Sequence, residues 1–326
     1  AWTAMEHYRL TGDRAYLEAL YPHLAASSRW QESRRRTTRV MVDGKRPVTY
    51  GLMPRGMGDG GLMNGKDYFG VFYTHNILAI FADKIAAEAA AILGRQDDQM
   101  ELRRNYETAL ADLKASLERG AIQEQDFRWI PGVPNLTSGS RWGALYALFP
   151  AGLLDKDDPL ITGTIRKIEQ SVSAGGQPIN TGWMSDGAWV AVTLDNLAEA
   201  HLVRGDADKA VQYLYSTLNH ATPLYSWCEE RGQEPGTKKI SGDRQHLWTP
   251  LAVVRYLRDS LVMEQGTELH LALATARPWL APGKTVAVTN ASSHFGDVSF
   301  RLTGAEGVIR ATVEPPARVE PSRLVL

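Results

Sequence analysis

A glycine-rich segment at residues 51–61 holds the first group of side chains that could perform chemistry. Asp59 stands among the glycines, Arg55 precedes it, and Asp67 and Tyr68 follow shortly after. Glycine allows the backbone to approach a ligand closely, but the lysine and hydroxyl residue that end a phosphate-binding loop are missing. The segment therefore predicts either a flexible connection with an aspartate turn or an acidic site.

Two adjacent glutamates, Glu229 and Glu230, form the second group. They follow Trp227, and Arg244 and Trp248 come later in the same loop region. Adjacent carboxylates repel each other, which tends to raise one of the two pKa values, and carboxylates beside an indole suit a site that positions a sugar and needs a base. The alternative interpretation is a solvated charged loop, in which Arg244 contributes only to the cap of the next helix.

Tryptophans in other loops make the third group. Trp183 lies in a glycine-bounded loop that also holds Asp186, and Trp129, Arg141 and Trp142 cluster before another expected helix. A single tryptophan usually belongs to a core, but several in loops at one end of a helical array could stack on sugars. For Asp186 the simplest interpretation is the cap of the helix that we expect to start there.

Metal and nucleophile motifs are missing from the sequence. The histidines His75, His201, His220 and His246 lack the spacing of a metal site, and no serine has the nucleophile-elbow motif. The single cysteine, Cys228, excludes a disulfide within the chain. We therefore expect neither a metal nor another cofactor.

Charge and hydropathy limit the classes of partner. The chain of 326 residues holds 36 lysines and arginines against 37 aspartates and glutamates, interspersed along the sequence. Without a basic stripe, nucleic acid is not an expected partner. No apolar run is long enough to cross a bilayer, so a membrane is not expected either. Because the sequence opens at Ala1 within a helical pattern, we expect it to belong to a longer protein.

A recurring joint between helices defines the elements that must position these residues. An apolar helical stretch ends at a glycine and an aspartate begins the next helix at residues 10–13, 93–97 and 203–206, with a looser copy at 151–155. Glycine adopts the left-handed conformation that closes a helix, and aspartate caps the helix that follows. The joints predict stacked helix pairs, with the short joints at one end and the long loops at the other.

Hydrophobic periodicity predicts a mainly helical chain that ends in strands. We expect nine helices, at 2–11, 16–36, 69–94, 97–119, 140–150, 157–173, 186–204, 207–219 and 244–264. After residue 264, apolar and polar residues alternate between glycines, prolines and asparagines, which predicts a small packed pair of sheets. The predicted domains are therefore a helical domain at 1–265 and a C-terminal β-sandwich-like domain at 266–326.

In this architecture the chain resembles the six-hairpin glycosidase superfamily, whose fold is an (α/α)6 barrel with its sugar site in the long loops. The likeness covers about residues 1–264, and the strands that follow resemble the C-terminal sandwich of bacterial rhamnosidase-like members. If the helix at 244–264 is the twelfth, Asp59 lies between the fifth and sixth helices, where glucoamylase-like inverting members keep the general acid. Glu229 and Glu230 lie between the eleventh and twelfth, where those members keep the general base. The resemblance implies a toroid that is incomplete here, because its first three helices are missing.

The function implied by this resemblance is an inverting glycoside hydrolase that acts on the O-glycosyl bond of an oligosaccharide or polysaccharide. Asp59 would be the acid and Glu229 the base, with Asp67 and Glu230 as substitutes, at a separation of about 6.5–9.5 Å. Many members use a glutamate as the acid, whereas the glycine-rich loop offers only aspartates. The residues expected to bind the sugar are Arg55, Tyr68, Trp129, Arg141, Trp142, Trp183, Asp186, Trp227, Arg244 and Trp248.

Two alternative functions stay open at this point. A disaccharide phosphorylase of the same fold would need a cationic pocket beside the base, for which Lys238, Lys239 and Arg244 are available. A non-catalytic carbohydrate-binding module would keep the aromatic side chains without two carboxyl groups facing one cleft.

Overall fold

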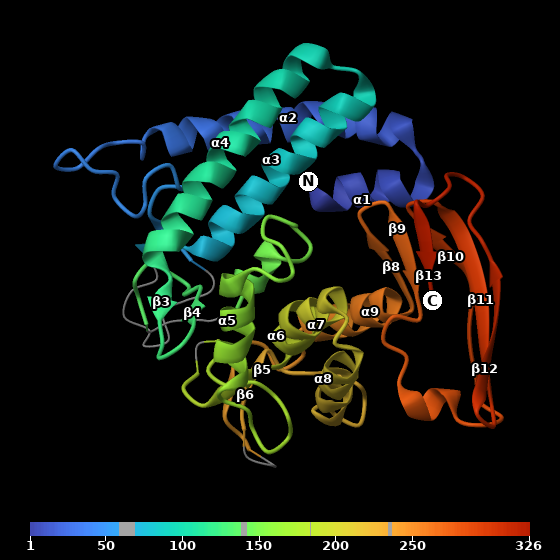
Figure 1. Cartoon of the computed structure of the whole chain (residues 1–326). Helices are drawn as coiled ribbons and strands as arrows, with labels where there is room; N and C mark the ends of the chain where they lie inside the picture. The colour runs from blue at the N-terminus through green and yellow to red at the C-terminus, as the bar shows by residue number, and fades with distance from the viewer. Residues whose placement is uncertain (59–68, 138–141, 183, 234–236) are drawn as a thin grey trace.

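The computed structural model describes residues 1–58, 69–137, 142–182, 184–233 and 237–326. Figure 1 shows a group of long helices near the N-terminus, a second group of shorter helices, and a body of strands at the C-terminal end. The longer helices are α1 (Trp2–Thr11), α2 (Arg14–Arg36), α3 (Tyr73–Leu93), α4 (Gln96–Gly120), α5 (Pro159–Glu169), α8 (Ala207–Asn219) and α9 (Trp248–Leu261). Residues 190–204 form one continuous helix, composed of α6 (Val190–Val192), the π-helical turn η2 (Thr193–Ala198) and α7 (Glu199–Arg204).

The three short joints are confirmed as helix ends. A glycine in the left-handed conformation ends each first helix: Gly12 (φ 76°) ends α1, Gly94 (φ 72°) ends α3 and Gly205 (φ 81°) ends α7. At the first joint Asp13 also caps α2, because its carboxylate accepts a hydrogen bond from Tyr16 N–H at 2.9 Å. The pairs α1/α2, α3/α4 and α7/α8 are therefore the predicted hairpins, and α2, α3 and α4 pack against one another.

Three of the expected aspartate caps are wrong. Asp97 lies in the first turn of α4, which begins at Gln96 with Arg95 at the cap position. At the looser joint the helix α5 begins after Asp158 and not at the expected Asp155. The side chain of Asp158 accepts a hydrogen bond from Leu160 N–H. Asp206 stands at the cap position of α8, but its side chain does not bond to the N–H groups of that helix. Its carboxylate lies 3.1 Å from His201 Nδ1 instead, so this aspartate links the two helices of the hairpin.

Five expected helices are shorter than predicted. Those at 69–94 and 157–173 are α3 and α5, and the other three were expected at 140–150, 186–204 and 244–264. Residues 142–150, the described part of the segment 140–150, contain a 3-10 turn, η1 (Ala144–Ala147), between the left-handed Gly143 and Pro150. A residue before proline disfavours helical conformation, which limits the helix at that end. The helix predicted at 244–264 is α9, and at Val262 its chain enters a strand.

The helix predicted at 186–204 begins at Val190, so the capping role expected for Asp186 is wrong. Asp186 has a φ of 57°, and residues 187–189 form the strand β5 (Gly187–Trp189). This strand pairs antiparallel with β6 (Glu230–Gly232), which pairs in turn with β7 (Ile240–Ser241). The strand exists because a segment about 40 residues away completes its hydrogen bonds, a requirement that local periodicity does not contain.

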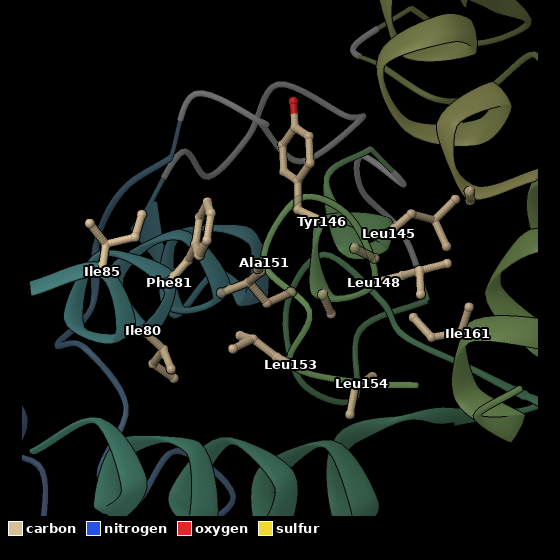
Figure 2. Packing of buried hydrophobic residues seen from close by; sticks show 14 of the residues in the cluster. Ile80, Phe81, Ile85, Leu145, Tyr146, Leu148, Ala151, Leu153, Leu154 and Ile161 are labelled. Carbon is tan, nitrogen blue, oxygen red and sulfur yellow. The ribbon is translucent and has the colours of Figure 1, made fainter. Parts of the chain in front are cut away.

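The helical core is continuous between the two groups of helices. Figure 2 shows side chains of α3, of η1 and the turn after it, and of α5 packed in one cluster. All of them are 9% exposed or less: Ile80, Phe81, Ile85, Leu145, Tyr146, Leu148, Ala151, Leu153, Leu154 and Ile161. Burial of apolar side chains is the main driving force for this packing.

The C-terminal strands form two three-stranded sheets around a core of their own. One sheet has the order β10-β11-β12 and the other the order β13-β9-β8, in which β13 is parallel to β9. The strands are β8 (Val262–Gln265), β9 (Glu268–Leu271), β10 (Thr285–Ser293), β11 (Gly296–Ala305), β12 (Val308–Glu314) and β13 (Arg323–Val325). Residues from both sheets fill the core between them, among them Leu269, Leu271, Val298 and Phe300. The expectation of strands after the helices is therefore confirmed, and the first strand starts four residues before residue 266.

The strands are joined to the start of the chain by polar contacts. His294 Nε2 lies 2.6 Å from Glu6 Oε1, and Arg318 donates to the carbonyl of Leu10 at 2.9 Å. Figure 1 shows α1 next to these strands. In the part of the chain that the structure describes, no helix combines the length and the apolar character that a membrane span requires.

Candidate functional site

Three tryptophans meet at the point where three long loops enter helices. Trp142 precedes η1, Trp189 precedes α6 and Trp248 is the first residue of α9. Their ring centroids are 5.3–5.5 Å apart in each pair, with the rings edge to face. This geometry is the one that aromatic quadrupoles favour. The sequence expectation that long loops gather at one end is therefore met for these three loops, and we call the three residues the tryptophan cluster.

Glu230 lies beside this cluster and is fully buried. It stands opposite Trp189 in the β5–β6 ladder, which puts both side chains on the same face of the sheet. Both of its carboxylate oxygens are 3.0 Å from Met184 N–H. A Cβ built on Gly182 would come within 2.6 Å of Glu230 Oε1 and 2.7 Å of the Trp189 ring, so only glycine fits between them.

Glu229 points to the other side of the strand, because successive side chains alternate. Its side chain is 13% exposed. One oxygen accepts from Asp243 N–H at 3.2 Å, and the other lies 4.0 Å from His246 Nε2. His246 packs edge to face against Trp248, at 6.2 Å between ring centroids. Glu229 is therefore linked to the tryptophan cluster through His246, and it is more exposed than the fully buried Glu230.

Two of the tryptophans expected to bind sugar lie elsewhere and are buried. Trp129 is 2% exposed in β4 (Arg128–Trp129), where its indole donates to Glu124 at 3.1 Å and Lys167 lies over its ring. Trp227 is 4% exposed and donates to the carbonyl of Thr217 at 2.9 Å. As folded, neither ring offers a face to a sugar, which corrects the expectation that a tryptophan in a loop belongs to the site.

Three other predicted residues are exposed at separate places. Arg55 donates to the carbonyl of Phe69 at 3.2 Å, across the hairpin of β1 (Gly56–Met57) and β2 (Phe69–Gly70). Asp186 lies in a turn closed by its own N–H, which donates to Asn180 at 2.8 Å. Arg244 is exposed in the loop before α9. The remaining predicted site residues are outside the described part of the chain: Asp59, Asp67, Tyr68, Arg141 and Trp183.

Sequence reasoning missed two members of this arrangement, Trp189 and His246. Trp189 follows Asp186 by three residues, and His246 follows Arg244 by two, so both lie in segments that the sequence analysis considered. The signal that could have found Trp189 is positional: like Trp142 and Trp248, it stands where a long loop meets a helix.

A buried charge cluster lies beneath the tryptophans, on the helix 190–204 and α9. Arg255 lies 2.8 Å from Asp195, 3.4 Å from Glu199 and 3.7 Å from Asp259. Asp195 also accepts from the hydroxyl of Tyr146. Burial raises the pKa of Glu199 well above its usual value, and burial raises that of Asp259 to about 6 although Arg258 and Arg255 oppose this. Burial thus disfavours the ionised forms of Glu199 and Asp259, and Arg255 is the cation that faces both of them.

We searched the described residues for a metal site and for a cavity that the predicted site residues line. Among the residues that the structure describes, no three His, Cys, Asp or Glu side chains are grouped as a metal site would require. A surface cavity of about 880 Å³ lies between α4, α5 and the hairpin of β3 (Ile122–Gln123) and β4. None of the predicted site residues lines it. Its arginines are already engaged, since Arg128 pairs with Glu118 and Arg166 with Asp126.

Comparison with known proteins identifies the fold. No protein-family model matches the sequence, and no curated protein is significantly similar to it. Among solved structures, a sialidase superposes on 96% of this chain with a TM-score of 0.62 and 13% identity, and an α-L-rhamnosidase from Dictyoglumus thermophilum superposes on 97% with a TM-score of 0.55 and 12% identity. The chain spans 31% and 33% of the length of these two proteins. It therefore shares its fold with part of each of them.

Proposed function

We propose that this chain is part of a glycoside hydrolase and that the tryptophan cluster marks its sugar site. The observation that carries the proposal is the convergence of Trp142 and Trp248 with a partly exposed carboxylate, Glu229, at the ends of separate loops. Aromatic rings provide the apolar faces on which sugars stack, and a carboxylate supplies the base that hydrolysis needs. The two proteins that share the fold, a sialidase and a rhamnosidase by name, support the same substrate class.

Glu229 is the proposed general base. It is 13% exposed, whereas Glu230 is fully buried with both oxygens directed at Met184 N–H. A base must reach the attacking water, so Glu229 suits this role, and Glu230 suits that of holding the loop around Met184 in place. The orientation of His246 toward Glu229 would help to keep the base in position.

Asp59 is the proposed general acid, with Asp67 as its substitute. The strands that flank this segment, β1 and β2, lead directly into α3. The first turn of α3 reaches the tryptophan cluster, since Thr74 donates to the carbonyl of Trp142 at 3.2 Å. An inverting mechanism would place the two carboxyl groups about 6.5–9.5 Å apart, with room for water between the base and the sugar.

The helical hairpins are proposed to belong to an (α/α)6 toroid that further segments complete. The three confirmed hairpins and the gathering of loop ends around the tryptophans support this arrangement. In the same proposal the helical domain, expected at 1–265, is followed by the sandwich, expected at 266–326, and the sandwich also takes in β8 (Val262–Gln265).

The test is hydrolysis of a panel of aryl glycosides and oligosaccharides by the complete protein, with and without phosphate. A hydrolase releases the same free sugar in both conditions, and NMR of the first product shows the inverted anomer. A requirement for phosphate with release of a sugar phosphate would indicate a phosphorylase instead. Binding of glycans without turnover of any panel member would contradict the hydrolase proposal in favour of a binding module.

A further inference from the structure

The helix 190–204 contains a π-helical turn, η2, where an uninterrupted α-helix would be expected. A π turn holds one more residue than an α turn, and such turns are found mostly as single insertions, frequently at functional sites. The whole turn is buried, and its polar residues Thr193, Asp195 and Asn196 are 6% exposed or less. A buried polar side chain needs a hydrogen-bond partner, so the partners of these three residues indicate what the turn does.

Asn196 holds the peptide group that follows Trp142. Its Oδ1 accepts from Gly143 N–H at 2.6 Å, and on the other side of the same peptide group Thr74 donates to the Trp142 carbonyl at 3.2 Å. Gly143 is left-handed (φ 83°), and a Cβ there would come within 2.5 Å of Thr74. The peptide group is thus fixed between α3 and η2, and this fixes the start of the Trp142 side chain.

Thr193 and Asp195 hold two further segments. Thr193 donates to Gln177 Oε1 at 2.6 Å, and Gln177 lies in the loop that leads to β5 and Trp189. Asp195 accepts from Tyr146 of η1 and from Arg255 at 2.8 Å. Arg255 lies seven residues after Trp248 on α9, about two helical turns away. One turn of helix therefore contacts all three segments that bear the tryptophan cluster.

We propose that η2 is a positioning element that fixes the places of Trp142, Trp189 and Trp248 relative to one another. The additional residue of the π turn directs the neighbouring side chains Asp195 and Asn196 to two positions, α9 and the start of η1. That this arrangement of the rings serves sugar binding rests on the proposed function. The positioning by η2 does not rest on it, because contacts between the three rings can be followed without any substrate.

The test uses substitutions that remove one contact of η2 each, in the complete protein. Asn196→Leu removes the acceptor of Gly143 N–H, and Thr193→Val removes the hydroxyl that binds Gln177 while keeping the shape. Thr193→Ser keeps that hydroxyl and is the rescue variant. Asn105→Leu is the matched control, because Asn105 is 5% exposed on α4, a helix that bears none of the three tryptophans. Near-UV circular dichroism reports the packing of the rings, and kcat/KM on an aryl glycoside reports the site.

Asn196→Leu and Thr193→Val are expected to lose a large part of the near-UV signal of the rings. They are also expected to lower kcat/KM by about 10- to 100-fold, the size of effect that a small misplacement of a site produces. Thr193→Ser and Asn105→Leu are expected to keep both. The proposal is overturned if Asn196→Leu and Thr193→Val keep the signal of the unsubstituted protein, or if Asn105→Leu loses it equally. Should Asn196→Leu fail to fold, the Thr193 pair decides. A protein without glycosidase activity would contradict the proposed function while the spectral comparison still tests the positioning.

Discussion

Replacement of Arg255 by methionine tests the buried charge cluster that supports the site. Its guanidinium faces three carboxyl groups, Asp195, Glu199 and Asp259, whose side chains are 8% exposed or less. Methionine keeps most of the length of the side chain and its packing, but leaves these groups without their shared cation. Removal of one partner from a buried ion pair typically costs about 3–5 kcal/mol, because the remaining charge is uncompensated. We expect a loss of this size in the free energy of unfolding at pH 7.

The loss of unfolding free energy caused by Arg255→Met should be larger at high pH than at low pH. Burial raises the pKa of Glu199 well above its usual value and that of Asp259 to about 6, and loss of the cation raises both further in the folded state. Because the folded state then binds more protons than the unfolded state, stability falls as pH rises above about 4. The loss caused by Arg255→Met should therefore be smaller at pH 5 than at pH 8.

The assay is urea unfolding of the complete protein at the two pH values. Arg277→Met is the control, since Arg277 pairs with Asp208 at 2.7 Å while both side chains are more than three-quarters exposed. An exposed pair contributes less than about 1 kcal/mol. The reasoning is refuted if Arg255→Met costs no more than Arg277→Met, or if its cost is the same at pH 5 and pH 8.

Three further predictions follow from single residues. Glu199→Gln removes a carboxyl group whose pKa burial raises, so the variant should gain stability over the unsubstituted protein as pH rises from 5 to 8, by about 1 kcal/mol or more in urea unfolding. An equal difference at both pH values would contradict this. Gly242→Ala places a Cβ 1.7 Å from Glu229 Oε2, so it should lower glycosidase activity. The control is Gly205→Ala, which has a similar φ but open space and should cost only about 1–2 kcal/mol of backbone strain in thermal unfolding. Equal activities of the two variants would argue against the role of Glu229. Asp13→Ala removes the cap of α2 and should cost about 1 kcal/mol, and unchanged stability would show that the cap is not used.

Secondary structure was predictable from the sequence where it depends on residues adjacent along the chain. Gly12, Gly94 and Gly205 end helices as expected, because the left-handed conformation is a property of the residue itself. The C-terminal strands were also predictable, and in β11 the alternation is seen directly, because Val298, Phe300 and Leu302 are buried and the residues between them are not.

The errors lie where distant segments decide the outcome. Residues 187–189 are a strand because β6 pairs with them, and Trp129 is buried because Glu124 and Lys167 surround it. The charges of Arg255 and Asp195 look like those of a solvated helix face in the sequence, and only the packing of α9 against η2 buries Asp195 and brings Arg255 against it. Glu229, Trp142 and Trp248 were among the residues predicted for a site, and their role stays a prediction; the contacts around them needed coordinates.

The most direct measurement for the central claim is the turnover number of Glu229→Gln in the complete protein on its best glycoside. Glutamine keeps the shape of Glu229 but cannot accept the proton of water, and general-base catalysis contributes about 10²- to 10⁴-fold. Asp243→Asn is the control, since it makes the same change in charge at an exposed neighbour whose backbone N–H binds Glu229. The account predicts a loss of this size for Glu229→Gln and near-normal turnover for Asp243→Asn. Near-normal turnover in Glu229→Gln would contradict it.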